Sequence, residues 1–297
     1  MRASTALLAI PAWVWASSAV AQELPATLGT FLREANPQER ATIKDVAKRL
    51  YPDQREAIDD LIDNIEDEEK VQVDRSSFVE GWTGEGSIGG NYASGNTDEW
   101  NVSAALNIKR KGPRWEHRVE ANVDFTDVDH QRTDERISAA YRVRRDFDKS
   151  PWFTFGALSY DHDRFQGIGN RYTESLGMGF ELIDSDDDAE DDVDWDVYAG
   201  PAFRQTDFTD GSQINQPGVF IATDLKWEIT DRLTLRQYAG TVLAKENKSF
   251  KSVTTLTNNL YGRLSARFDL TLETETDPPM GAEESDIYTR MSLVYDF

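Results

Sequence analysis

The chain has 297 residues, a formal net charge of -22 and no cysteine. Without cysteine, disulfides and thiolate metal sites are excluded, and the acidic charge disfavours nucleic acid as a partner because phosphates would be repelled. The mean hydropathy of -0.60 is that of a soluble protein, but the strands of a membrane barrel alternate in polarity and also average to a polar value.

The N-terminus has the features of a secretory signal peptide. Arg2 gives a positive start, residues 6–16 are mostly apolar, and Ala19 and Ala21 are the small residues that a signal peptidase requires. The apolar run is shorter than the roughly 20 residues of a membrane-spanning helix. We therefore predict that residues 1–21 are a signal peptide and that the protein is exported.

Residues 22–79 have a helical pattern. Asn36, Pro37 and Glu39 suit a helix N-cap, a first turn and a capping box. Apolar residues then recur three and four positions apart, up to residue 50 and again over residues 57–65, and a shorter helix is expected before Asn36. We predict a small periplasmic helical segment, which packs on itself, on the barrel mouth or on a periplasmic partner.

From residue 80 to the C-terminus, apolar and polar residues alternate. Trp100, Val102 and Ala104, for example, alternate with Asn101 and Ser103. Successive side chains of a strand point to opposite faces, so this period predicts strands. About twelve strands are predicted, and the alternation is least clear in the fifth and the tenth. Their ranges are 80–94, 97–110, 114–127, 133–146, 151–163, 170–183, 193–207, 217–229, 232–244, 252–260, 263–275 and 285–297.

The connections between these strands are expected to alternate in length. Short periplasmic turns and longer outer loops are typical of outer-membrane barrels, as is an even strand number. Longer outer loops are predicted at 127–133, 207–216, 245–251 and 276–285, whereas the tight turn at 94–96 and the long acidic turn at 184–192 depart from the pattern.

The polar face of the predicted strands carries charges of both signs, whereas aromatic residues gather near the periplasmic strand ends. Such a girdle marks a membrane interface, so we expect the apolar face to meet outer-membrane lipid and lipopolysaccharide. The predicted girdle comprises Trp115, Trp152, Trp195, Trp227, Tyr261 and Tyr295. The predicted lumen-facing cations are Arg118, Arg142, Arg144, Arg204, Lys226, Arg236, Arg267 and Arg290. The fold class is therefore an all-β, antiparallel up-and-down transmembrane barrel of about 12 strands (residues 80–297), located in a Gram-negative outer membrane.

Several motifs of the barrel region resemble a known family. They are Gly84–Tyr92, Ser94–Thr97, Arg171-Tyr172 with Gly177–Gly179, Asp277–Pro279 and the terminal Val294–Phe297. Over about residues 80–297 the chain resembles the salt-stress-induced outer-membrane proteins. The resemblance implies an outer-membrane barrel without an assigned substrate or reaction. A final strand that ends in Phe297 also resembles the signal that the barrel-assembly machinery reads.

Two clusters of residues could carry chemistry. Asp161, His162 and His130 are the candidates for a catalytic site at the outer rim, but Asp161 and His162 are adjacent on a strand and point to opposite faces. An acidic run could bind Ca²⁺ but lacks the order of an EF-hand, so a solvated loop is the preferred interpretation. This run includes Asp186, Asp187, Asp188, Glu190, Asp191 and Asp192.

The sequence therefore predicts a non-catalytic envelope protein that needs no cofactor. Its role would be structural, in envelope integrity under osmotic stress, or that of a narrow channel for small solutes or ions. The alternative is an outer-membrane hydrolase, a protease or a lipid-modifying enzyme, with a site at the extracellular rim. Arginines that face acidic residues favour a narrow or closed lumen, because unpaired interior charge is costly.

Overall fold

The computed structural model describes most of the chain after the predicted signal peptide. The described residues are 24–35, 37–93, 99–128, 131–164, 166–184, 192–278 and 283–297. Residues 1–21 and the predicted tight turn at 94–96 lie outside the described residues.

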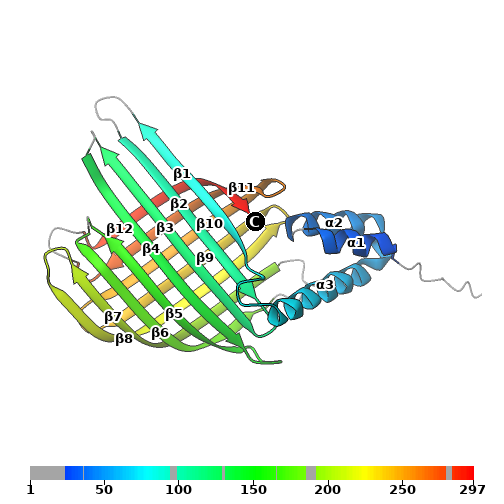
Figure 1. The fold of residues 1–297 in the computed structure, drawn as a ribbon, viewed down its shortest axis with the longest axis horizontal. Helices are drawn as coiled ribbons and strands as arrows, with labels where there is room; N and C mark the ends of the chain where they lie inside the picture. The colour runs from blue at the N-terminus through cyan, green and yellow to red at the C-terminus, as the bar shows by residue number, and fades with distance from the viewer. Residues whose placement is uncertain are drawn as a thin grey trace, which may run out of the picture.

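The strands form one closed antiparallel barrel in which each strand pairs with its neighbours in sequence, and the last strand pairs with the first (Figure 1). This confirms the predicted twelve-stranded, up-and-down barrel. The strands are β1 (Thr83–Ala93), β2 (Glu99–Lys111), β3 (Trp115–Val128), β4 (Gln131–Asp146), β5 (Trp152–Asp163), β6 (Ile168–Ile183), β7 (Asp192–Phe208), β8 (Gln213–Thr230), β9 (Leu233–Ala244), β10 (Lys248–Tyr261), β11 (Leu264–Glu275) and β12 (Ser285–Asp296).

Two strands begin four residues earlier than the sequence predicted. β8 starts at Gln213 and β10 at Lys248, and β4 begins at Gln131, soon after β3 ends at Val128. The predictions of long loops at 127–133, 207–216 and 245–251 were therefore wrong. Most of the added strand residues, such as Asn215 opposite Gln205, are polar, whereas Ile214 and Phe250 are apolar, and they pair in regular antiparallel register. Such strand ends resemble loops in composition, because a single apolar residue among polar ones is too little to show the alternation.

β1 pairs with two strands, and its seam with β12 is the shorter of the two pairings. It runs from Glu85 opposite Asp296 to Gly89 opposite Ser292, whereas β1 pairs with β2 over its whole length. Beyond the seam, Gly84 and Phe297 exchange two backbone hydrogen bonds, N to O at 3.1 and 2.8 Å. The last residue of the chain thus closes the barrel.

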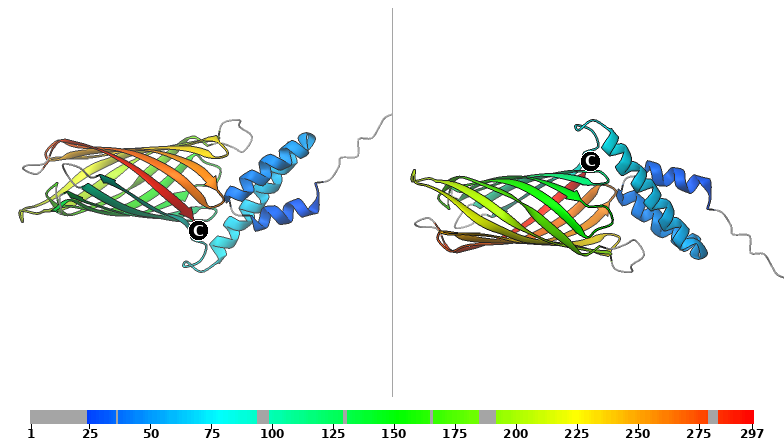
Figure 2. Two further views of the ribbon diagram at one scale, coloured as in Figure 1. Left: turned by 90° about the horizontal axis from the view of Figure 1, so that it is seen from above. Right: turned by 90° about the horizontal axis from the view of Figure 1, so that it is seen from below.

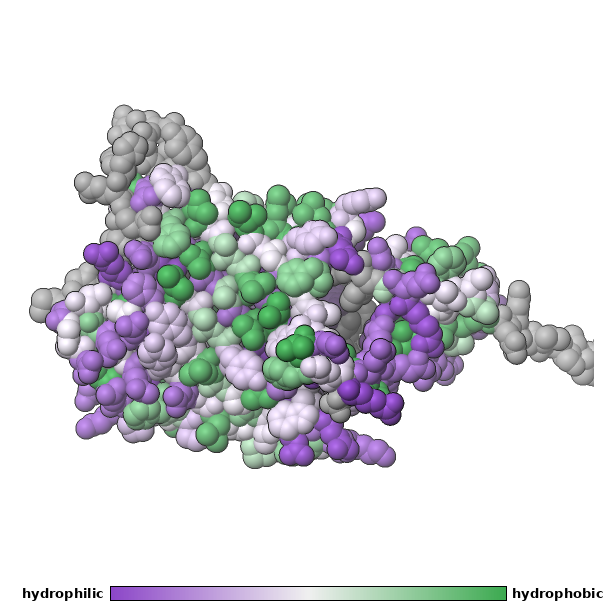
Figure 3. Space-filling model, in the orientation of Figure 1, coloured by the Kyte–Doolittle hydropathy of each residue, from purple (hydrophilic) through white to green (hydrophobic). Residues whose placement is uncertain are grey.

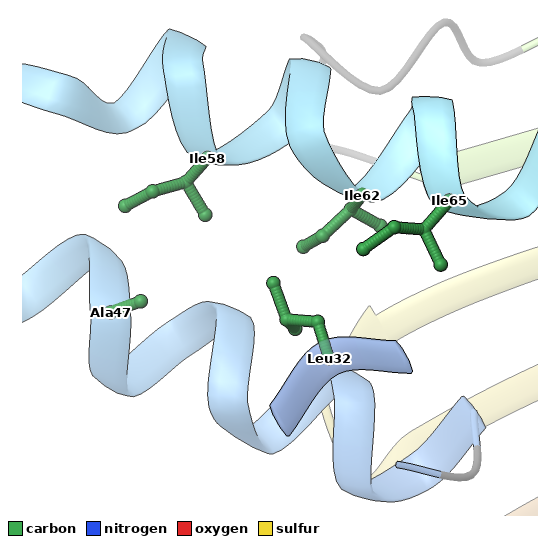
Figure 4. Packing of buried hydrophobic residues seen from close by; sticks show 5 residues of the cluster. All are labelled: Leu32, Ala47, Ile58, Ile62 and Ile65. Carbon is green, nitrogen blue, oxygen red and sulfur yellow. The ribbon is translucent and has the colours of Figure 1, made fainter. Parts of the chain in front are cut away.

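The N-terminal segment forms helices at the end of the barrel where the chain also terminates (Figure 2). They are α1 (Ala26–Glu34), α2 (Pro37–Leu50), the short η1 (Pro52–Gln54) and α3 (Arg55–Arg75). None of the described helices combines the length and apolar character needed to cross a bilayer. Their own core consists of Leu32, Ala47, Ile58, Ile62 and Ile65 (Figure 4).

A buried arginine joins the three helices. Arg40 on α2 donates to the Leu32 carbonyl near the end of α1 at 3.0 Å and to the Glu69 carboxylate on α3 at 2.7 Å. The predicted helical segment is confirmed. Its helices pack chiefly on each other, which is the first of the three predicted packing modes.

The outer face of the barrel is apolar around its middle. Figure 3 shows hydrophobic side chains over the centre of the visible face and hydrophilic ones at its ends. The six predicted girdle residues, from Trp115 to Tyr295, are all exposed, and mid-strand residues such as Leu176 and Met291 are exposed as well. An exposed apolar band of this kind is typical of a surface that meets an apolar environment.

Candidate functional site: the charged lumen

Along each strand, the side chains that line the lumen alternate with the exposed apolar side chains of the outer face. On β7, for instance, Trp195 is exposed whereas Tyr198 is buried within the barrel. Contacts between strands that are not neighbours identify this inner face, because only the concave side of a barrel brings such strands together. Arg267 of β11 reaches Glu85 of β1 at 2.7 Å in this way.

An outer network of ion pairs crosses the lumen in the half farther from the helices. Arg136 Nη1 on β4 lies 3.2 Å from Glu273 Oε2 on β11, with β3, β2, β1 and β12 between the two strands on the shorter side. Arg171 on β6 donates from Nη2 to Glu275 Oε2 of β11 at 3.1 Å, with β7 to β10 between. Both contacts therefore connect nearly opposite walls.

Further polar groups fix this outer network. Lys251 Nζ lies 2.8 Å from the other Glu273 oxygen, and Asn247 Nδ2 donates to Glu275 at 2.9 Å. Asp163 accepts from the Arg136 guanidinium at 2.8 Å. Arginines with several charge-assisted partners are held in one geometry, so the outer half of the lumen is obstructed by defined side chains.

An aromatic wall lines one side of the lumen nearer the helices. Phe155 and Tyr198 are in edge contact at 5.1 Å between ring centroids, and Phe220 lies 5.8 Å from Tyr198. Phe153 and Tyr238 pack against this cluster. These rings narrow the lumen from one side, and they explain why the fifth strand alternates poorly in sequence: its inward residues are apolar too.

The half of the lumen nearer the helices holds an inner network of charges. Arg142 donates to the Tyr198 hydroxyl at 2.6 Å, and Arg144 lies 2.6 Å from the Asp196 carboxylate on β7. Arg118 pairs with Glu116 at 2.9 Å. Positive and negative groups are thus mixed, and the passage is not lined by a single sign of charge.

The remaining predicted lumen cations have different surroundings. Arg290 contacts Asp124 of β3, and Lys226 contacts Glu228 and Asp194. Arg204 is buried and donates to Ser249 of β10 at 2.7 Å. Arg236, within the part of the chain that is described, forms no ion pair within 4 Å.

The predicted catalytic residues are not brought together. Asp161 and His162 occupy opposite faces of β5, as their adjacency requires: His162 Nδ1 lies 2.5 Å from the Gly169 carbonyl of the next strand. The charges of Lys251 and Arg171 act on Asp161 within the lumen. His130 lies outside the described residues.

The predicted calcium run is not described by the structure. Asp186, Asp187, Asp188, Glu190 and Asp191 lie outside the described residues, and Asp192 begins β7. Among the residues that are described, histidine, aspartate and glutamate form no cluster of three suited to a metal ion.

The outer network was missed by the sequence analysis. Arg136, Arg171, Glu273 and Glu275 all lie on predicted strands, with the parity of the polar face, so their inward orientation was accessible. Their pairing was not accessible, because it depends on the shear of the closed barrel, which brings residues of nearly opposite strands to the same height.

Comparison with known proteins identifies a family. Residues 86–297 match the model of a family described as "Protein of unknown function, DUF481". That description does not include a salt-stress role, so the role implied by the resemblance stays a prediction. A search of curated protein sequences found no match.

Solved structures with a similar overall shape include outer-membrane proteins. The NanC porin shares 10% identity at a TM-score of 0.45, over 72% of this chain and 100% of the porin. An outer membrane channel from Pseudomonas putida F1 shares 8% identity at a TM-score of 0.45, over 73% and 96% of the two chains. The translocator domain of the autotransporter NalP from Neisseria meningitidis shares 13% identity at a TM-score of 0.40, over 73% of this chain and 87% of the translocator domain.

Proposed function

The chain belongs to the family described as "Protein of unknown function, DUF481", and from this premise we propose that it is an outer-membrane β-barrel with a narrow, charge-lined channel for small ions and solutes. The role is non-catalytic. The observation that carries the proposal is the pair of contacts Arg136–Glu273 and Arg171–Glu275, which cross the lumen between nearly opposite strands. Twelve strands enclose a lumen of intermediate width, and side chains that cross it leave only small gaps.

The membrane location is supported by the outer face. β9 has 12 residues, and a strand of this length rises about 30 Å along the barrel axis at about 3.3 Å per residue and a tilt of about 40°. This is enough to cross the apolar band of about 25 Å that is usual for such barrels. Lipid and lipopolysaccharide would cover the exposed apolar residues.

The N-terminal helices would then lie in the periplasm, at the end of the barrel where both chain termini are expected. Phe297, which ends the closing strand, would be read by the barrel-assembly machinery. The surface of the helical segment within 22–79 is available to a periplasmic partner.

Charged networks are compatible with slow ion passage. The side chains of Arg136 and Glu273 are 17% and 23% exposed, so solvent reaches both. Small ions would pass through the solvated gaps beside these ion-paired side chains, which stay in place. A channel of this kind would pass small ions while it excludes larger solutes, which suits a role in osmotic balance.

The test is single-channel recording in planar lipid bilayers with the refolded mature protein. We expect small, discrete conductance steps. The double variant Glu273→Gln, Glu275→Gln removes the two carboxylates that cross the lumen, and we expect its step conductance to be larger or its open periods longer. The control Glu283→Gln, Glu284→Gln removes two exposed carboxylates before β12 and should conduct as the wild type does.

Two outcomes would overturn the proposal. A correctly folded wild-type barrel that gives no steps at any voltage would indicate a structural barrel with a closed lumen. Large steps in the wild type, unchanged in the Glu273 and Glu275 variant, would show that ions do not pass the outer network.

A further inference from the structure

The linker between α3 and β1, residues 76–82, lies against the outside of the barrel. Its main anchor is Arg110 on β2, whose position in the strand has the same parity as the exposed Leu106. Arg110 Nε donates to the Glu80 carbonyl at 3.0 Å, and Nη2 donates to the Val73 carbonyl at 2.6 Å. Arg110 is buried by these contacts although it is on the outer face.

Arg110 also binds the C-terminal end of α3. Val73 lies in the last turn of the helix, and its carbonyl also accepts from the backbone N–H and the hydroxyl of Ser76, which caps the helix, at 3.1 and 2.7 Å. A guanidinium is a favourable partner there, because the C-terminal end of a helix carries partial negative charge. The chain then reverses at Gly81, whose φ of +75° favours glycine. The linker is therefore a fixed structure on the barrel wall.

Aromatic rings continue this contact along the wall. Phe78 meets the imidazole of His117 on β3 edge-on at 5.2 Å between ring centroids, and Trp82 lies 5.7 Å from Phe78. His117 in turn stacks near Trp115 and Tyr141, at 6.3 and 6.1 Å. The Trp82 indole nitrogen already donates to the Phe78 carbonyl at 2.8 Å, so the ring can enter an apolar medium without losing a hydrogen bond.

The linker nevertheless leaves apolar surface uncovered. Phe78 is 55% exposed and Val79 is 80% exposed. Phe78 contacts His117, which stacks near Trp115, the first residue of β3, and β5 begins with Trp152 at the same end of the barrel. The exposed linker residues are thus continuous with the aromatic girdle of the barrel.

We propose that residues 76–82 form a membrane foot, in which Phe78 and Val79 insert into the periplasmic leaflet of the bilayer beside the barrel and hold the helical segment at the membrane surface. The partner is the interfacial region of a phospholipid layer, which favours aromatic rings with a satisfied polar atom. The nearby Arg145, whose guanidinium carbon lies 5.5 Å from the Trp115 ring centre, suits the lipid phosphates. The proposal rests on the membrane placement proposed above.

Because the chain contains no cysteine, single cysteine variants can be labelled without background. Val79→Cys is labelled with an environment-sensitive fluorophore and refolded into vesicles of phosphatidylethanolamine and phosphatidylglycerol. Some vesicles carry lipids with a quencher near the headgroup, and others carry a quencher deep in the acyl chains. We expect a blue-shifted emission that the shallow quencher abolishes more effectively than the deep one.

Two matched positions separate the possible outcomes. Leu176→Cys, in the exposed apolar band of β6, should be quenched by lipid if the barrel spans the membrane. Asp53→Cys, exposed on η1, should respond only to a quencher in the water. If the label at Leu176 is quenched while that at Val79 behaves like the label at Asp53, the foot is disproved and the membrane barrel stands.

If no label responds to lipid quenchers, the membrane placement fails and the foot fails with it. A label at Val79 that is shielded from water yet not quenched by lipid would indicate a protein partner and would also overturn the foot. Folding of each variant is checked by the change in gel mobility on heating.

Discussion

The guanidinium carbon of Arg136 lies 4.0 Å from the centre of the Tyr288 ring, and the same guanidinium contacts Asp163 and Glu273. One side chain on β4 therefore joins β5, β11 and β12. The arrangement combines a cation–π contact with charge-assisted hydrogen bonds, both of which strengthen where water is partly excluded.

Replacement of Arg136 should destabilise the barrel. Arg136→Leu leaves Asp163 and Glu273 without their guanidinium partner, and we expect a loss of about 2 kcal/mol in the free energy of unfolding, less than for a fully buried pair because these groups are partly exposed. The measurement is urea-induced unfolding of the refolded barrel in lipid vesicles. Arg114→Leu, which loses an exposed pair with Asp148, is the control and should change little. Equal effects of the two substitutions would contradict a structural role for the outer network.

Arg236 should influence ion selectivity. It lies in the lumen and has no ion pair within 4 Å in the described part of the chain, so its charge acts directly on ions that pass. Arg236→Gln should shift the reversal potential in a salt gradient towards cation preference, because one positive charge is lost from the passage. Arg232→Gln, in the exposed turn before β9, serves as the matched control. An unchanged reversal potential in Arg236→Gln would mean that permeating ions avoid this part of the lumen.

Close strand contact at Gly200 should make this position intolerant of a side chain. A Cβ on Gly200 would lie 1.9 Å from the Leu176 carbonyl oxygen of β6, a backbone atom that cannot move alone, whereas a Cβ on Gly86 would meet open space. We expect Gly200→Ala to lower stability by about 1–3 kcal/mol and Gly86→Ala to have little effect. The two variants are compared by the temperature at which the refolded protein loses its compact gel mobility. Similar temperatures would argue against the tight approach of β6 and β7.

Arg40 should control the helical segment independently of the barrel. Arg40→Gln loses the contacts that join α1 and α3, with an expected cost of about 2 kcal/mol because charged hydrogen bonds are involved. Hydrogen exchange should accelerate in residues 26–75 and stay unchanged in the strands. Arg49→Gln, which loses only an exposed pair with Asp45, should leave both regions protected. If exchange in the strands increases as well, the two parts of the protein are coupled.

The strands were predictable because their physical cause is local. Alternation in β2, β3, β11 and β12 follows from the opposite orientation of neighbouring side chains, and the predicted ends agree with the structure within a few residues. β5 was harder to recognise, because Phe153 and Phe155 point inward and remove the polar half of the pattern. The early starts of β8 and β10 were missed for the opposite reason, since most of the residues there are polar.

The site was predictable only in part. The inward orientation of Arg142 or Arg267 follows from strand parity, whereas their partners Asp224 and Glu85 depend on the register of the whole barrel. The position of Phe78 against His117 could not be predicted either. The two residues belong to segments that the sequence separates into a helical part and a barrel part, and no local pattern joins them.

The pairing of Gly84 with Phe297 has a consequence for biogenesis. The two edges that complete the cylinder come from opposite ends of the barrel sequence, and few hydrogen bonds join them directly. Exposed strand edges invite aggregation, so the half-built sheet must be shielded until the final residues arrive. A chain truncated before Ser292 would lack every residue of β12 that pairs with β1, and its sheet would stay open along one line.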